Sequence, residues 1–175
     1  MMKQLFLVRH AKSSWSEPGK ADHERPLADR GIRDTQRMFS RLRDHGTAFD
    51  SIVTSDAVRA KNTAERLRQT LGYGRAPHQQ AQLYDAGLDD ILAVVRALPD
   101  HHASVALVGH NPGLTFASNK LVADLRIDNL PTCGIVGMEF PATHWREIDI
   151  GGGTLIYFDY PKNSGPPLLS SATDS

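Results

Sequence analysis

The sequence has little of what marks secreted, membrane-spanning and nucleic-acid-binding proteins. Its 175 residues include a single cysteine, Cys133, which excludes an intrachain disulfide and suggests a small buried apolar side chain. Twenty Lys and Arg balance twenty Asp and Glu, so no global charge favours nucleic acid or an anionic membrane as a partner. The chain also has no run approaching the ~18 apolar residues that a membrane span needs.

Targeting and metal-binding signals are equally scarce. The first apolar run ends at residue 8, is too short for a signal peptide and is followed by charge, so we expect a cytoplasmic protein. The eight histidines show no metal-ligand spacing, since His101 and His102 are adjacent, unlike the i,i+4 pairs of helical zinc motifs. The length suits one domain, which we place at residues 1–161. Residues 162–175, rich in Pro, Ser, Gly and Asp, predict a flexible tail.

What the chain does contain is a short apolar run that leads into two cationic side chains. Residues 5–8 are all apolar, as in a strand buried on both faces of a parallel sheet, and Arg9 and His10 follow directly. Ligands of open α/β sheets collect where strands end, so Arg9 and His10 should lie in a crevice. A guanidinium can bind phosphate there, and an imidazole can attack or carry protons near neutral pH. The dipeptide alone fits a strand end without function equally well.

Strands and helices alternate along most of the chain. Apolar stripes and capping residues predict helices over residues 29–45, 57–71 and 88–98, and one that has Asn111 as its N-cap and Pro112 at its first position. Short apolar runs predict strands over residues 50–54, 81–85 and 104–108, and later over 134–140, 145–150 and 154–160. This pattern predicts an α/β sheet with helices on both faces and an antiparallel edge.

Two more cationic residues follow predicted strands. Arg59 lies in the first turn of a helix, where a cation opposes the helix dipole unless an anion binds beside it. His110 follows the strand at 104–108. We expect these two residues and the Arg9–His10 pair to meet at one sheet edge as an anion-selective pocket. The chain has no Walker-type glycine loop and no carboxylate cluster for Mg²⁺, so arginines would neutralise a phosphoryl group and a histidine would accept it.

These residues stand in motifs that resemble those of the histidine phosphatase superfamily. The resemblance runs from Leu7 to about Pro161. Its motifs are Leu7–Ser13, Arg25–Leu27 with Arg30–Gly31, Ser55–Ala60 with Thr63–Ala64, and Gly109–Pro112. The short chain without a large inserted cap is similar to the SixA-type phosphohistidine phosphatases. The resemblance implies a three-layer α/β/α sandwich with a mostly parallel central sheet and an antiparallel edge.

The same resemblance implies roles for individual residues. His10 would be the nucleophile, and no metal or other cofactor is expected. The phosphoryl group would be bound by Arg9, Arg59 and His110, with Ser13 and Asn111 as further candidates. Trp15, in the polar loop over residues 11–28, would either wall the pocket or cover the edge of the core.

Two positions depart from the family pattern. The superfamily commonly reads Arg-His-Gly, whereas Ala11 follows His10 here, and its methyl group fits if φ is negative. Many members carry a glutamate after the third strand, and the nearest counterpart here is Asp85. Asp85 would be either the catalytic general acid or a loop carboxylate that caps the helix beginning near Leu88.

The leading hypothesis is a metal-independent phosphatase that works through a phosphohistidine intermediate and removes phosphate from phosphohistidine on a protein. Phosphohistidine has a good leaving group, so a weak or missing acid would suit that substrate. The alternatives are a small-molecule phosphomonoesterase, which would depend on Asp85, and a non-catalytic phosphate-binding adaptor. A mutase is disfavoured because the short chain leaves little room for a closing cap. The expected partner is thus a phosphorylated protein or a small phosphate ester, with no nucleic acid and no membrane.

Overall fold

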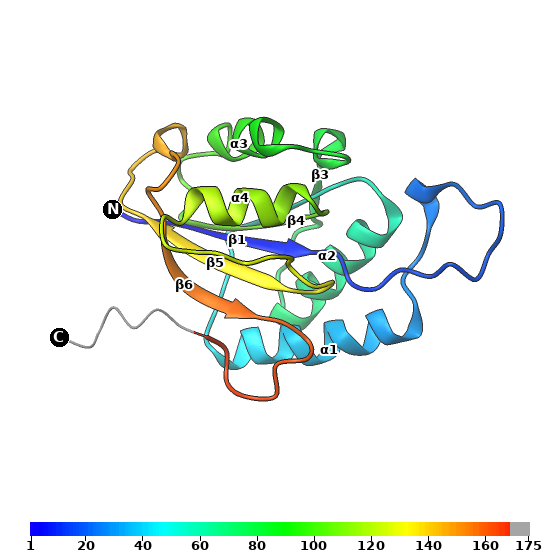
Figure 1. Ribbon diagram of the computed structural model, residues 1–175. Coiled ribbons are helices and arrows are strands. Elements are labelled where there is room, and N and C mark those ends of the chain that lie inside the picture. The colour runs from blue at the N-terminus through cyan, green and yellow to red at the C-terminus, as the bar shows by residue number, and fades with distance from the viewer. Residues whose placement is uncertain (169–175) are drawn as a thin grey trace.

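Strand β1 (Lys3–Arg9) lies inside a six-stranded sheet in the computed structural model, which describes residues 1–168 (Figure 1). The strand order is β3-β2-β4-β1-β5-β6. The other strands are β2 (Ser51–Thr54), β3 (His78–Gln79), β4 (Ser104–Gly109), β5 (Ile135–Phe140) and β6 (Thr154–Asp159). Neighbours from β3 to β1 pair in parallel, whereas β5 pairs antiparallel with both β1 and β6. The mostly parallel sheet with an antiparallel edge is therefore confirmed.

Helices cover both faces of the sheet, which explains why β1 is apolar without a break. Its residues Phe6 and Val8 pack in one core with α1 (Asp29–Asp44) and α2 (Val58–Leu71). Leu5 and Leu7 point the other way, into a core shared with α3 (Leu88–Arg96) and α4 (Gly113–Leu121). These two cores confirm the α/β/α sandwich (Figure 1). Among residues 1–168 no helix is long and apolar enough to cross a membrane.

Two predicted strands are wrong. Within residues 81–85 only Leu83 is buried, and no strand of the described sheet pairs with this segment. Ala81–Leu83 instead forms a 3-10 turn, which the Tyr84 N–H closes by donating to the Ala81 carbonyl. The edge strand lies earlier, as β3. Residues 145–150 begin with another 3-10 turn, because Glu147 accepts a hydrogen bond from the His144 N–H, and the Trp145 indole N–H donates to the His102 carbonyl.

The segment after β6 runs back along the domain. Leu168 pairs with Phe158 as an isolated antiparallel bridge, and each N–H donates to the other's carbonyl at 2.7 Å. Arg41 of α1 also donates to the Gly165 carbonyl at 2.6 Å. The flexible tail predicted for residues 162–175 thus falls partly on this described segment, and residues 169–175 lie outside the described residues.

Candidate active site

The two arginines and two histidines that were predicted to meet surround one hollow of about 270 Å³ at the carboxyl edge of the sheet. Arg9 ends β1 and His10 follows it, Arg59 is the second residue of α2, and His110 follows β4. The ring centroids of His10 and His110 are 5.1 Å apart. The expected residues Ser13, Asn111 and Asp85 also line this pocket, together with Lys12, Trp15 and Arg25. The structure therefore brings all the predicted site residues to one place.

The end of β1 is held by the loop that precedes β5. The Cys133 N–H donates to the carbonyls of Arg9 and His10, at 3.1 and 3.0 Å, and the Arg9 N–H donates to Gly134 at 3.0 Å. Cys133 is fully buried, as expected, and has a φ of 60°, a conformation uncommon for residues other than glycine. The Arg9 Nη1 donates to the Leu130 carbonyl at 2.9 Å. A loop about 120 residues away in sequence thus orients Arg9 and His10.

The hydrogen bond of His10 selects one tautomer. Its Nδ1 lies 2.8 Å from the Ala11 carbonyl oxygen, which can only accept, so Nδ1 carries the proton and Nε2 keeps a lone pair. His10 is 7% exposed, and burial lowers its pKa to about 3, against a bond to Ala11 that raises it. The charges of Arg59 and Arg9 lower the pKa further. His10 is therefore a neutral imidazole with one free nucleophilic nitrogen at neutral pH.

Close packing links His10 to Arg59. Ala11 is fully buried and lacks a positive φ, so its methyl group fits as expected. The Ala11 N–H donates to Thr63 Oγ1 at 3.0 Å, and the Thr63 hydroxyl donates to the Arg59 carbonyl at 2.8 Å. On the other side, a Cβ on Gly31 would lie 2.2 Å from the Lys12 carbonyl oxygen, so only glycine lets α1 pack this closely. These contacts explain why Thr63 and Gly31 belong to the sequence motifs described above.

Ser55 orients His110. Its Oγ lies 2.8 Å from His110 Nε2 and also accepts the Ala57 N–H at 3.2 Å. The other ring nitrogen, Nδ1, is buried and has no hydrogen-bond partner in the described part of the chain. Burial lowers the pKa of His110 to about 4, and the charge of Arg59 adds to this shift. His110 thus offers one buried ring nitrogen for a ligand while the other is held in place.

Sequence reasoning missed Asp22, which binds Arg59 directly. Its carboxylate accepts from Arg59 Nη2 at 3.0 Å, from Arg25 Nη1 at 2.9 Å and from the Tyr84 hydroxyl at 2.6 Å, and its carbonyl accepts from Arg59 Nη1 at 2.6 Å. The Tyr84 hydroxyl, more than the two arginines, holds the pKa of Asp22 far below its usual range. Asp22 is one polar residue in a turn-rich loop, so no sequence signal singled it out.

Arg25 attaches the 11–28 loop to the pocket. Its guanidinium donates to the Ser13 hydroxyl, and to the Ser14 carbonyl at 3.1 Å. The Trp15 ring stacks on this guanidinium, with the Arg25 Cζ 3.2 Å from the ring centroid. Of the two roles left open for Trp15, walling the pocket is the one observed. The Ser13 hydroxyl, a candidate for substrate binding, is already bonded to Arg25.

Both ends of the Asn111 amide are hydrogen-bonded, one to the segment that precedes β5 and the other to the first turn of α4. Its Nδ2 donates to Asn129 Oδ1 at 3.1 Å and to the Leu130 carbonyl at 2.9 Å, while Oδ1 accepts from the N–H and hydroxyl of Thr115 at 3.1 and 2.8 Å. Helix α4 begins at Gly113, one residue later than predicted, because Pro112 occupies the N-cap position. Asn111 therefore shapes the pocket wall and also holds the loop that carries it.

Asp85 lies at the mouth of the pocket. It is exposed and has a φ of 54°, a left-handed conformation that aspartate tolerates better than most residues. The capping role left open for it is filled by Asp90, whose Oδ2 accepts from the Gly87 N–H at 3.1 Å. The Asp85 carboxylate consequently belongs to the pocket and not to the cap of α3.

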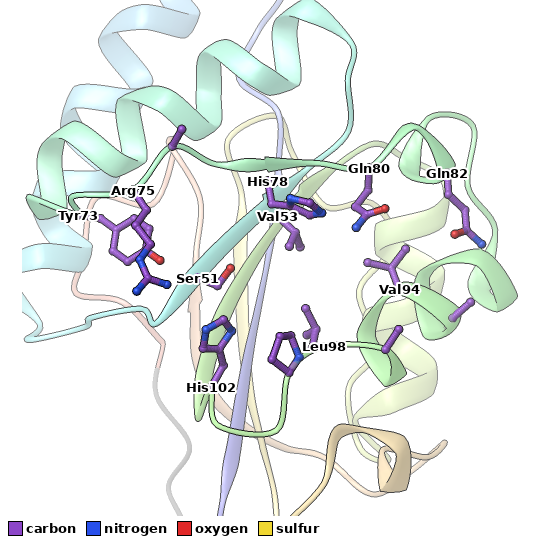
Figure 2. A pocket seen from close by; sticks show the side chains of 14 residues that line it. Ser51, Val53, Tyr73, Arg75, His78, Gln80, Gln82, Val94, Leu98 and His102 are labelled. Atoms are coloured by element: carbon purple, nitrogen blue, oxygen red, sulfur yellow. The ribbon is translucent and has the colours of Figure 1, made fainter.

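A larger hollow, of about 510 Å³, lies along the β3 edge of the sheet (Figure 2). His78 and His102 line it together with the apolar side chains of Val94 and Leu98 (Figure 2). Neither the two arginines nor the two histidines of the candidate site line it, so cavity size does not locate the chemistry in this protein. Within residues 1–168, no three or more His, Cys, Asp or Glu side chains are grouped to hold a metal ion.

We expect the low pKa of His10 to make the protein sensitive to acid. The folded-state pKa of about 3 lies below the ordinary 6.5, so as the pH falls from 6.5 towards 3 the unfolded chain binds the proton first. The contribution of His10 to the free energy of unfolding is fully present above pH 6.5 and is lost as the pH falls across this window. Between pH 7 and pH 5 the loss is about 2 kcal/mol. Urea unfolding at the two pH values should show a smaller loss for His10→Gln than for the wild type, and equal losses would contradict the assignment.

Comparison with known proteins places the fold and the motifs in one family. Residues 5–91 match the model of the histidine phosphatase superfamily (branch 1). An uncharacterized protein of Mycobacterium tuberculosis is 33% identical over 167 residues, which cover 89% of this chain and all of the relative. A structure described as a candidate phosphohistidine phosphatase SixA from Nakamurella multipartitia superposes with a TM-score of 0.77 at 26% identity, covering 93% of this chain and 98% of the other.

A further structure, the protein histidine phosphatase SixA complexed with tungstate, has a TM-score of 0.77 at 21% identity and covers 90% of this chain and 97% of the other. At that identity the likeness shows the fold alone. The family match, by contrast, spans the β1 exit, the 11–28 loop and the start of α2, which together supply most of the pocket. The chain belongs to the histidine phosphatase superfamily, branch 1, and has a SixA-type fold.

Proposed function

We propose that this phosphatase works without a metal ion, through a phosphohistidine intermediate on His10, and removes phosphate from phosphohistidine on a protein. The observation that carries the proposal is the state of His10, a buried neutral imidazole with Nε2 free, in a pocket that also holds Arg9 and Arg59. A nucleophile of this kind splits one difficult transfer into two easier ones. The two arginines supply the positive charge that a transferring phosphoryl group needs.

In the first step, the Nε2 lone pair of His10 attacks phosphorus, and the bond to the leaving nitrogen or oxygen breaks. The leaving group takes up a proton, from solvent when it is the imidazole of phosphohistidine and from Asp85 when it is an alkoxide, while Nδ1 of His10 keeps its own proton bonded to the Ala11 carbonyl. In the second step water attacks phosphorus, the bond to Nε2 breaks, and inorganic phosphate is released. Arg9, Arg59 and Nδ1 of His110 would donate to the equatorial oxygens in both steps, because charge accumulates there in the transition state.

How readily the leaving group is protonated indicates which substrate this pocket suits. An imidazole that leaves phosphohistidine is readily protonated, whereas a serine or sugar alkoxide needs a proton from the enzyme in the transition state. In this pocket the acid for that task is Asp85, which lies exposed at the mouth. Asp85 is exposed and its side chain is one methylene shorter than the glutamate that many members of the superfamily carry, and this supports a substrate whose leaving group needs little help from an acid, as in phosphohistidine.

The second candidate function is a small-molecule phosphomonoesterase. It is favoured by the position of Asp85 in the pocket wall, since that residue would then be the general acid. A non-catalytic phosphate-binding adaptor has no use for a nucleophile that is already deprotonated and aligned, so the state of His10 argues against it.

Asp85→Asn is expected to separate the two enzymatic functions. Hydrolysis of an aryl or sugar phosphate should fall by about 10²-fold or more, because a general acid contributes on that scale, whereas hydrolysis of a phosphohistidine peptide should change only slightly. The measurement is kcat/KM on both substrates for the wild type, Asp85→Asn and the control Asp89→Asn, which alters another exposed acid of the same region. An equal loss on both substrates, or a wild-type preference for a sugar phosphate, would favour the small-molecule phosphomonoesterase.

A further inference from the structure

Of the two exposed aromatic side chains among the large apolar residues of the described chain, one lies at the catalytic pocket and the other at a hollow that shares walls with it. Trp15 is 72% exposed and lines the pocket itself. Phe116, on α4, is 51% exposed and lines a second hollow of about 390 Å³. The two hollows share Asp85, His110 and Asn111 as walls. Aromatic side chains of this kind are enriched at interaction sites and carry much of the binding energy there.

The hollow beside Phe116 is largely apolar and has rigid walls. Ala86, Leu88, Pro112 and Phe116 form its apolar lining. The start of α4 packs directly on the turn before α3, since a Cβ on Gly113 would lie 2.2 Å from the Ala86 carbonyl oxygen. The hollow is therefore preformed, and a side chain that entered it would not have to order the walls first.

The charges around this hollow indicate what it can accept. The lining contains one acid, Asp85, and no lysine or arginine. The neutral state of His110 adds no positive charge. Outside the lining, Lys120 Nζ lies 5.3 Å from the centroid of the Phe116 ring. An acidic side chain inside the hollow would face Asp85 and lose its hydration, whereas an apolar side chain would bury surface against Leu88 and Phe116.

Trp15 is ordered before any partner arrives. Its ring stacks on Arg25, and the Arg25 guanidinium is held in turn by Asp22, by the Ser13 hydroxyl and by the Ser14 carbonyl. An exposed tryptophan normally loses side-chain entropy when it is bound, but much of that loss has already occurred here. The ring therefore presents a fixed apolar face at the pocket.

We propose that Trp15, Phe116 and the apolar hollow beside His110 form a docking surface for the polypeptide that carries the phosphoryl group. The hollow takes an apolar side chain that neighbours the phosphorylated residue. The inference rests on the proposed function, because it assumes a phosphoryl group in the His10 pocket. It adds that the substrate is selected by an apolar neighbour, which follows from the walls that the two hollows share.

The test uses two phosphohistidine peptides that differ only in one flanking residue, leucine or serine, and phosphoramidate as a P–N substrate without a peptide. For the wild type we expect kcat/KM on the leucine peptide to exceed that on the serine peptide about tenfold, the scale of one good apolar anchor. Phe116→Ala should raise KM for the leucine peptide to that for the serine peptide, so that the preference disappears. Hydrolysis of phosphoramidate should stay unchanged. Ile150→Ala is the control, because Ile150 is another exposed large apolar side chain, 56% exposed, and lines neither hollow.

Trp15→Ala should raise KM for both peptides by a larger factor than KM for phosphoramidate. Trp15→Phe should bring KM for the peptides most of the way back to the wild-type value. An unchanged leucine preference in Phe116→Ala, or an equal loss on phosphoramidate, would overturn the docking surface. Failure of the proposed function gives a different result, in which the wild type leaves all three P–N substrates intact. The same leucine–serine comparison with phosphotyrosine peptides and phenyl phosphate then decides the docking surface by itself.

Discussion

His10→Ala should abolish turnover, by about 10⁴-fold or more in kcat, while the protein stays folded. The reason is that Nε2 of His10 is the free nitrogen of a neutral imidazole in this pocket, held by the bond from Nδ1 to the Ala11 carbonyl. The side chain is also a desolvated group whose protonation is disfavoured, so its removal does not uncover an unpaired buried charge. Folding is therefore expected to survive, and circular dichroism and thermal unfolding check this.

Rapid quenching supplies the direct measurement for the nucleophile. Wild-type protein mixed with a ³²P-labelled substrate and quenched in alkaline denaturant, which preserves P–N bonds, should carry the label on the peptide that contains His10. His10→Ala should carry none, and His101→Ala, which alters an exposed histidine outside the pocket, should label like the wild type. Label on any other residue, or full activity of His10→Ala, would refute the assignment.

Arg59→Ala is expected to lower kcat/KM by about 10²-fold or more, equivalent to about 3 kcal/mol of transition-state binding. Arg59 is 7% exposed, so its charge acts on the phosphoryl group with little screening by water. Its two terminal nitrogens bind Asp22 in the described structure, at 2.6 and 3.0 Å. The variant therefore removes a charge from the pocket and also frees the carboxylate that orients it.

Arg59→Lys separates charge from geometry. Lysine keeps the positive charge but lacks the planar fork, so activity should recover only in part. Arg66→Ala, on the same helix outside the pocket, is the control and should retain wild-type kcat/KM. EDTA should have no effect on any of these proteins, and a strict requirement for a divalent metal ion would overturn the proposed mechanism.

The sequence by itself determined the central strand, the helices and the main cluster. The unbroken apolar run of β1 has one physical cause, burial on two faces, and Arg9 and His10 follow it at the sheet edge where parallel strands end. Arg59 and His110 follow β2 and β4 in the same way. Local periodicity and the residues that follow each strand are properties of short segments, which is why residues from three separate stretches of the chain could be predicted to meet.

Only the tertiary structure decided which residues orient that cluster. Asp22 binds Arg59, Cys133 holds the backbone of Arg9 and His10, and Ser55 fixes one nitrogen of His110. The two wrong strands, at 81–85 and 145–150, have a common origin, since both segments begin as 3-10 turns and neither pairs with a strand of the described sheet. Each of these contacts joins groups that no local pattern relates, and their energies depend on positions that exist only once the sheet and helices have packed.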